Sequence, residues 1–205
     1  IHAWAMGPVG APPTAPPPAW RVSRALNGGG LGMNWGVYEL DFLFGLCDWR
    51  LRPVTVSAQA WPVAACVSDR VAPGSDAETH LSAFIRCAGG ETIILERGEF
   101  AASPARAAWQ LTGSDGGLEL HLWDPREPVR LHRIDPARGV QVEVLHHEPG
   151  SQAQFMRGPL TDFCAAIAEG RTPQTGLERA LALARVCDAL YASAASGREV
   201  AVAGA

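Results

Sequence analysis

Three polar side chains follow a run of glycines in the segment "GGGLGMNWGVYELD", which covers residues 28–41. Asn34, Tyr38 and Asp41 are spaced by four and three residues, so on an α-helix they would share a stripe about 60° wide. A phenol can donate or accept a proton, and an amide can orient a hydroxyl group but cannot take its proton. The spacing therefore predicts a helix face suited to proton transfer with a hydroxylated ligand. An ordinary solvated helix face has the same pattern.

The glycines before this stripe do not form a dinucleotide-binding loop. The fingerprint of such a loop needs glycines at positions n, n+2 and n+5. Counting from Gly28 or from Gly30, the third position is occupied by Met33 or Trp35. Because glycine has no Cβ atom, the segment instead predicts a backbone that a ligand can approach closely.

Other candidate groups support two interpretations each. Arg21 and Arg24 lie beside the glycines, where they would hold an anionic or polyhydroxylated ligand or simply solvate the loop. His80 lies near Asp76 and Glu78, which suggests either a metal site or the turn-forming acids that precede a strand.

The composition excludes several classes of protein. The 205 residues are 47% hydrophobic and 19% charged, and the net charge of −4 gives no reason to expect nucleic acid or an anionic membrane as partner. Five scattered cysteines without CxxC spacing argue against a disulfide framework and a zinc site, and favour a cytoplasmic location. The chain starts with Ile1 and contains no lysine, since all 17 basic residues are arginine. The absent methionine suggests a fragment, a processed product or a trimmed chain.

The elements that must position the stripe are predicted from periodicity and turn residues. We expect strands over 1–10 and 52–63, a helix over 28–46, antiparallel hairpins between 78 and 147, and helices over 158–170 and 175–197. Pro159 fits the first turn of its helix. The chain is thus predicted to be a single α+β domain over residues 1–205, with helices packed on one face of an open, mainly antiparallel sheet.

The other face of that sheet is predicted to be a partner surface. Its strands carry large apolar side chains at Trp61, Trp109, Leu118, Leu120 and Leu122. Exposed apolar area on this scale usually marks an interface, which predicts a homo-oligomer. The alternative is a polar face left in water.

Two stretches of the chain resemble the Gfo/Idh/MocA oxidoreductases. The segment "WRVSRALNGGGLGMNWGVYELDFLFGL" is similar to the helix that opens the catalytic half of that family. The segment "GPLTDFCAAIAEGRTPQTGLERALALARVCDALYASAASGREVAV" is similar to its closing helix pair. The order and spacing match from about residue 20 to residue 202, with the predicted strands between them.

The resemblance implies a C-terminal domain without its cofactor domain. Family members first carry a Rossmann domain, which binds NAD or NADP and supplies a lysine that helps catalysis. This chain has neither the fingerprint nor a lysine. The resemblance also implies a sugar, cyclitol or similar polyol as substrate, and oligomer contacts through the open face of the sheet.

The family's functional positions fall on the polar stripe. A family Asp corresponds to Asn34, and a family His corresponds to Tyr38, where tyrosine also occurs within the family as an acid/base. The resemblance further implies substrate-binding roles for Asp41, Trp35, Arg21 and Asn27, and a cofactor-facing role for Gly29 and Gly30.

Two hypotheses remain open. In the first, the chain is the substrate side of an enzyme in which Tyr38 and Asn34 are catalytic. In the second, it is a non-catalytic sugar-binding or oligomerisation module derived from the family, which the replacement of the family carboxylate by Asn34 favours.

Overall fold

The computed structural model describes residues 1–121, 124, 126–147 and 152–204. The chain forms two compact units, a first unit of residues 1–108 with 183–205 and a second unit of residues 109–182. The single domain expected over residues 1–205 stays a prediction.

The strands form an open, mainly antiparallel sheet, which confirms the predicted fold class. Their order is β8-β7-β6-β5-β1-β4-β3-β2-β9. The pairing of β1 with β4 is parallel, whereas β2–β3, β3–β4, β5–β6, β6–β7 and β7–β8 are antiparallel. The strands are β1 His2–Pro8, β2 Pro53–Trp61, β3 His80–Cys87, β4 Thr92–Ala101, β5 Arg106–Thr112, β6 Gly116–Leu120, β7 Val129–Asp135, β8 Gly139–His146 and β9 Val200–Ala201.

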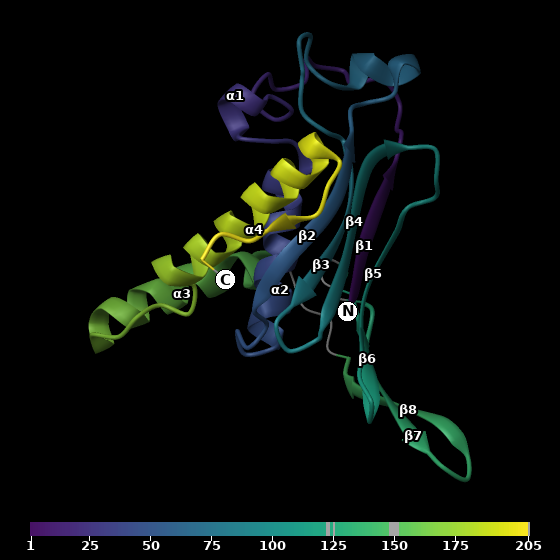
Figure 1. The fold of residues 1–205 in the computed structure, drawn as a ribbon, viewed down its shortest axis with the longest axis vertical. Coiled ribbons are helices and arrows are strands. Elements are labelled where there is room, and N and C mark those ends of the chain that lie inside the picture. The colour runs from purple at the N-terminus through teal and green to yellow at the C-terminus, as the bar shows by residue number, and fades with distance from the viewer. Residues whose placement is uncertain (122–123, 125, 148–151, 205) are drawn as a thin grey trace. The chain divides into compact units, whose positions relative to one another are not determined.

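One face of the sheet in the first unit is covered by helices. Every second residue of β3 is buried, including Leu81 and Ile85, because successive side chains on a strand point to opposite faces. The helices α2 (Val37–Leu46) and α4 (Leu177–Ser196) lie on the same side of these strands (Figure 1). The hydroxyl of Ser193 on α4 accepts a hydrogen bond from the Ala58 N–H of β2. Sheet and helices thus enclose the core of this unit.

The helix predicted over 28–46 begins later than expected. Helical structure begins with a π-helical turn, Gly32–Gly36, and continues as α2. A short helix, α1 (Arg24–Asn27), ends before it at Gly28, which has a left-handed φ of 77°. The prediction was wrong for Gly28, Gly29 and Gly30 because glycine loses more backbone entropy in a helix than other residues.

The predicted hairpins are confirmed. The β3–β4 turn contains Gly90 with a φ of 91°, and the β7–β8 turn ends at Gly139 with a φ of 77°. Such positive φ values favour glycine, which is why glycines in the sequence predict turns at these positions.

The second unit contains a helix that is longer than predicted. The helix α3 spans Gln152–Glu169, so Pro159 lies in its interior and its expected place in the first turn was wrong. The residues before the proline contain no helix breaker of their own except Gly158, which explains the longer helix. None of the helices in the described ranges combines the length and apolarity needed to cross a bilayer.

Candidate functional site

The polar stripe lies where the π-helical turn meets α2, in the first unit. Tyr38 is 56% exposed, while Asn34 and Asp41 are half-buried. The rings of Trp35 and Tyr38 meet edge to face, with their centroids 6.3 Å apart. Tyr38 therefore projects from a helix with its ring supported by a neighbour, as the sequence-based hypothesis requires, although its catalytic role stays a prediction.

A buried ion pair fastens this helix to the sheet. Glu39, next to Tyr38, is fully buried and pairs with Arg97 of β4. The guanidinium carbon of Arg97 also lies 4.9 Å from the centre of the Trp35 ring, within range of a cation–π contact. The ion pair and the ring contact determine which side of α2 faces the strands. The sequence analysis missed both residues, because neither belongs to a motif.

A second buried carboxylate holds the glycine loop. Glu78 is 2% exposed, and its two oxygens accept the N–H groups of Gly30 and Gly32, each at 2.9 Å. Tyr191 of α4 donates its hydroxyl to Glu78 at 2.7 Å and accepts the Met33 N–H at 3.1 Å. Burial, and then the adjacent Glu78, raise the pKa of Tyr191, so the phenol remains a donor.

The two glycines predicted to face a cofactor are packed against protein groups on one side. A Cβ atom added to Gly29 would lie 2.2 Å from the Tyr191 hydroxyl oxygen, and one added to Gly30 would lie 1.9 Å from the Glu78 carbonyl oxygen. These contacts explain why both positions are glycine without any ligand. Their assignment to a cofactor stays a prediction, and a cofactor would have to meet the opposite side of the loop.

The predicted substrate-binding residues before the loop are engaged in local contacts. Arg21 pairs with Glu99 at 2.5 Å, and the side-chain amide of Asn27 donates to the carbonyl oxygens of Arg21 and Gly29. Arg24 donates from its backbone N–H to the carboxylate of Asp76 at 2.8 Å. These contacts hold the segment before the glycine loop in place. The substrate contacts of Arg21 and Asn27 stay predictions.

The residues around His80 serve three different purposes. Glu78 binds the glycine loop and Asp76 contacts Arg24, whereas His80 faces Glu96 at 3.3 Å. Within the part of the chain that the structure describes, no three metal-ligating side chains gather to form a metal site.

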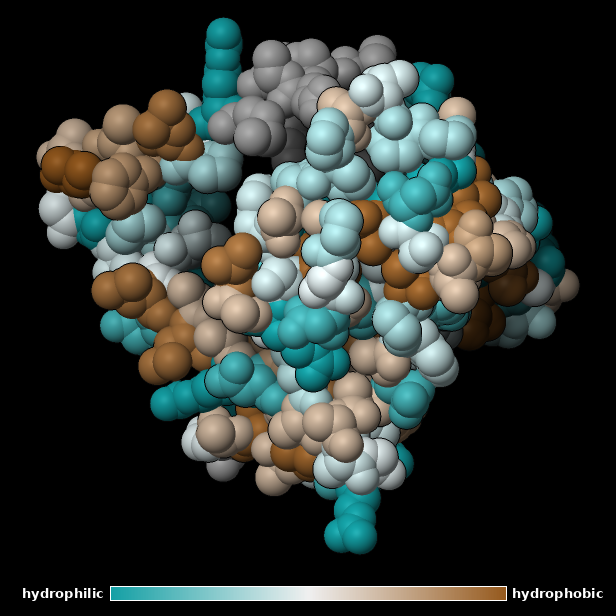
Figure 2. All heavy atoms as spheres, turned by 90° about the horizontal axis from the view of Figure 1, so that it is seen from above, coloured by the Kyte–Doolittle hydropathy of each residue, from teal (hydrophilic) through white to brown (hydrophobic). Residues whose placement is uncertain are grey.

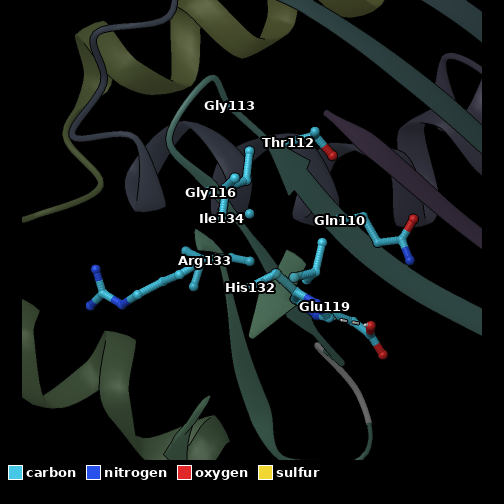
Figure 3. A pocket seen from close by; sticks show the side chains of 11 residues that line it. Gln110, Thr112, Gly113, Gly116, Glu119, His132, Arg133 and Ile134 are labelled. Atoms are coloured by element: carbon cyan, nitrogen blue, oxygen red, sulfur yellow. Dashed lines mark ion pairs between the residues drawn. The ribbon is translucent and has the colours of Figure 1, made fainter. Parts of the chain in front are cut away.

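A hollow of about 330 Å³ lies in the second unit. Figure 3 shows Gln110 and Thr112 of β5 on one side of it, and the ion pair between His132 and Glu119 on the other. None of the residues predicted to be catalytic or to bind substrate or cofactor lines this hollow, whereas Leu118 of the predicted partner surface does.

The apolar face predicted for the sheet is smaller than expected. Trp61 is 44% exposed, but Trp109 and Leu120 are buried, so the prediction was wrong for both. Strand alternation explains why they share one fate, because Trp109 and Leu120 are cross-strand partners and therefore point to the same face. Leu118 is half-buried, and Leu122 lies outside the described residues. Figure 2 shows hydrophobic side chains at the surface in several separate places, mixed with hydrophilic ones.

Comparison with known proteins identifies the fold. The family model of the GFO/IDH/MocA C-terminal domain matches residues 2–119. Levoglucosan dehydrogenase in complex with NADH and levoglucosan has a TM-score of 0.77 and 18% identity, covering 98% of this chain and 57% of that one. An oxidoreductase domain protein from Kribbella flavida has a TM-score of 0.75 and 18% identity, with 98% and 59% covered. No curated protein matches the chain.

A further solved structure carries a different printed activity. The aldose-aldose oxidoreductase from Caulobacter crescentus, complexed with glycerol, has a TM-score of 0.69 and 22% identity, and covers 98% of this chain and 55% of that one. At such identities these structures establish the fold alone. The chain spans little more than half the length of the solved structures it matches.

Proposed function

This chain belongs to the Gfo/Idh/MocA family, and from that premise we propose that it is the substrate-side domain of an NAD(P)-dependent oxidoreductase. The complete enzyme would move a hydride between a nicotinamide cofactor and the carbinol or carbonyl carbon of a sugar, cyclitol or similar polyol. The fold it shares with NADH-bound levoglucosan dehydrogenase supports the coarser part of this proposal.

The observation that carries the proposal is the contrast between Tyr38 and its surroundings. Its phenol is exposed, yet the helix beneath it is fastened by two buried carboxylates, Glu39 and Glu78. A proton-transfer group needs this combination of access and fixed position. Tyr38 exchanges the proton of the reacting hydroxyl, and Asn34 orients the same oxygen.

The surrounding residues would bind the rest of the substrate. Asp41 lies one turn beyond Tyr38 on the same helix and holds a second hydroxyl, while Trp35 offers an apolar ring beside it. Arg21 and Asn27 border the loop and complete the substrate side.

Cofactor binding falls mainly to a domain outside this chain. The glycine segment lacks the dinucleotide fingerprint, and the N–H groups of Gly30 and Gly32 are already bonded to Glu78. When bound, the nicotinamide would accept or supply the hydride. This chain's contribution is the proton and the orientation of the substrate, with Gly29 and Gly30 bordering the cofactor.

Substitution of Tyr38 tests the proposal. In the protein with its cofactor domain, turnover of NAD+ or NADP+ is measured with a panel of sugars and polyols that includes levoglucosan. Tyr38→Phe should lower kcat by about 100-fold or more, the usual size of a general acid–base contribution. Its melting temperature should stay near that of the wild type, because the side chain is exposed. Wild-type turnover in Tyr38→Phe on the best substrate would show that the assignment is wrong.

Asn34→Asp provides a second, sharper variant. It restores the carboxylate that the family carries at this position, with nearly the same size and shape. If Asn34 orients the reacting oxygen, this variant should remain active and shift its pH dependence. If the wild-type protein turns over none of the substrates, and neither Asn34→Asp nor Tyr38→Phe changes ligand binding, the non-catalytic module would be favoured.

A second function, assembly into a homo-oligomer, is favoured by the uncovered face of the first unit. The register places His2, Ile94 and Phe84 side by side, with Trp61 and His80 further along the same face. Ile94 is 40% exposed and Trp61 is 44% exposed. These aromatic and apolar side chains, with Ser82 and Glu96 between them on the same face, fit a second copy of the chain.

Light scattering after size exclusion tests this second function. The wild type should have the mass of a dimer or a larger oligomer, and Ile94→Asp should reduce it. Leu26→Asp, on α1, is the matched control because Leu26 is 69% exposed elsewhere in the same unit. A monomeric wild type would contradict assembly through this face.

A further inference from the structure

The contacts of Glu78 and Tyr191 form a latch on the backbone of the glycine loop. We use this term for the Glu78 carboxylate, the Tyr191 hydroxyl and the N–H groups of Gly30, Gly32 and Met33. Glu78 precedes β3, and Tyr191 lies on α4, so the latch joins three parts of the chain that are far apart in sequence. Backbone N–H groups at the start of a helix have no partner within the helix, and here side chains take that place.

The Glu78 carboxylate is stabilised within the latch by hydrogen bonds from neutral groups rather than by a cation. Three neutral donors, two N–H groups and one hydroxyl, point at its two oxygens. Hydrogen bonds to a carboxylate are about twice as strong as those between neutral groups. A buried carboxylate in this setting therefore fixes the direction of every donor around it.

The glycine loop packs closely against Tyr191 and Glu78, which leaves no room for the loop to shift. A Cβ atom on Gly32 would lie 2.7 Å from the Tyr191 hydroxyl oxygen, and the corresponding positions on Gly29 and Gly30 are tighter still. The loop, Glu78 and Tyr191 thus interlock in one arrangement.

The π-helical turn begins at the latch. The Val37 N–H donates to the Gly32 carbonyl oxygen, five residues back, while the Gly32 N–H is held by Glu78. In an α-helix each residue rotates by about 100° around the axis, so the side chains of Asn34 and Tyr38, four residues apart, would point in directions about 40° apart. A π-helical turn holds more residues, so each residue rotates less and the two side chains come closer to alignment.

We propose that Glu78 and Tyr191 are positioning residues that hold the π-helical turn in the register where Asn34 and Tyr38 meet the same substrate oxygen. This inference rests on the proposed function of Tyr38 and adds two residues that act through the backbone of the glycine loop. Loss of the latch lets the turn relax toward an α-helix, which rotates Asn34 away from Tyr38.

Tyrosine NMR tests the latch without any need for activity. The chain contains two tyrosines, Tyr38 and Tyr191, and both are labelled with ¹³C on the ring. Tyr191→Phe should shift or split the Tyr38 signal, and Glu78→Gln should do the same. Glu96→Gln is the matched control, because it removes a half-buried carboxylate that faces His80 on the other side of the sheet. An unchanged Tyr38 signal in a folded Tyr191→Phe protein would overturn the proposal.

Kinetics then separate positioning from a purely structural role. In the protein with its cofactor domain, Tyr191→Phe should lower kcat at least about tenfold at temperatures well below its melting point, with a smaller change in KM. In a Tyr38→Phe background the same change should have little further effect, because it acts through Tyr38. If Tyr191→Phe fails to fold, Glu78→Gln serves instead. If Tyr38→Phe lowers kcat but both Tyr191→Phe and Glu78→Gln keep the wild-type kcat, the positioning role of the latch is wrong and the proposed function still holds. If Tyr38→Phe keeps full activity, the proposed function is wrong.

Discussion

Two buried glutamates hold the same helix by different means. Glu78 binds neutral donors, two of which are backbone N–H groups of the glycine loop, whereas Glu39 binds the guanidinium of Arg97. Glu78 therefore determines where the helical segment begins, and Glu39 determines which side of it faces the sheet. The start of the helical segment thus depends on contacts to the main chain, whereas its orientation against the sheet depends on a pair of side chains that can be replaced.

This difference predicts different tolerance to substitution. A buried ion pair can often be replaced by apolar side chains of similar size, because both charges and their desolvation costs vanish together. No such exchange exists for Glu78, since the N–H groups it accepts remain after any substitution in its own side chain.

The largest effect is expected from breaking the ion pair on one side. Glu39→Leu leaves the Arg97 cation nearly buried and should lower the free energy of unfolding by about 3–5 kcal/mol. The double variant Glu39→Leu with Arg97→Met should recover most of that loss. Urea unfolding monitored by tryptophan fluorescence measures both. A double variant as unstable as the single one would show that the charge of Arg97 is not the cause.

A somewhat smaller effect is expected from a methyl group in the latch. Gly30→Ala places a Cβ atom against the Glu78 carbonyl oxygen, so the loop must shift at a cost of about 3 kcal/mol. Gly36→Ala is the control within the same segment, because its Cβ meets its nearest neighbour at an ordinary 3.7 Å. Gly36→Ala should be neutral or stabilising by up to about 1 kcal/mol. Equal melting temperatures for the two variants would contradict the packing described for the latch.

The hairpins could be predicted from the sequence because their signals are local. The turn glycines at 90 and 139 have positive φ values, and the strands beside Gly90 alternate in burial over much of their length, as their residue types suggested. The polar stripe was also recognisable, since its spacing depends on one helix. The parallel pairing of β1 with β4 was missed, because no short-range pattern records it.

The supports of the site could not be predicted for the same reason. Tyr191 and Met33 are separated by 158 positions, and Arg97 and Glu39 by 58. Each of these side chains also fits a simple local explanation, such as a helix face or a strand. The glycine run was a usable signal, because Gly29 and Gly30 have close neighbours, whereas Gly28 has a left-handed φ of 77° at the end of α1. The sequence alone suggested a ligand as that neighbour, whereas the structure shows Glu78 and Tyr191.

The smallest expected effect is a loss of stability at alkaline pH from the buried groups on α4 beside the latch. Burial raises the pKa of the Cys187 thiol, one turn before Tyr191, to about 11, and burial also raises the pKa of Tyr191. Both groups stay neutral in the folded chain while the unfolded chain ionises. The stabilisation from Cys187 is therefore complete below pH 9 and is lost as the pH rises toward 11, whereas that from Tyr191 is complete below pH 10 and decreases only above it. The free energy of unfolding should fall by about 2 kcal/mol over this range for Cys187, and further above pH 10 through Tyr191. Urea unfolding under reducing conditions at pH 8 to 10.5 measures this, and Cys187→Ala should remove only about half of the loss that begins at pH 9, because burial also raises the pKa of the Cys87 thiol on β3 to about 11. The same alkaline slope in wild type and Cys187→Ala would assign the loss to groups outside this end of α4.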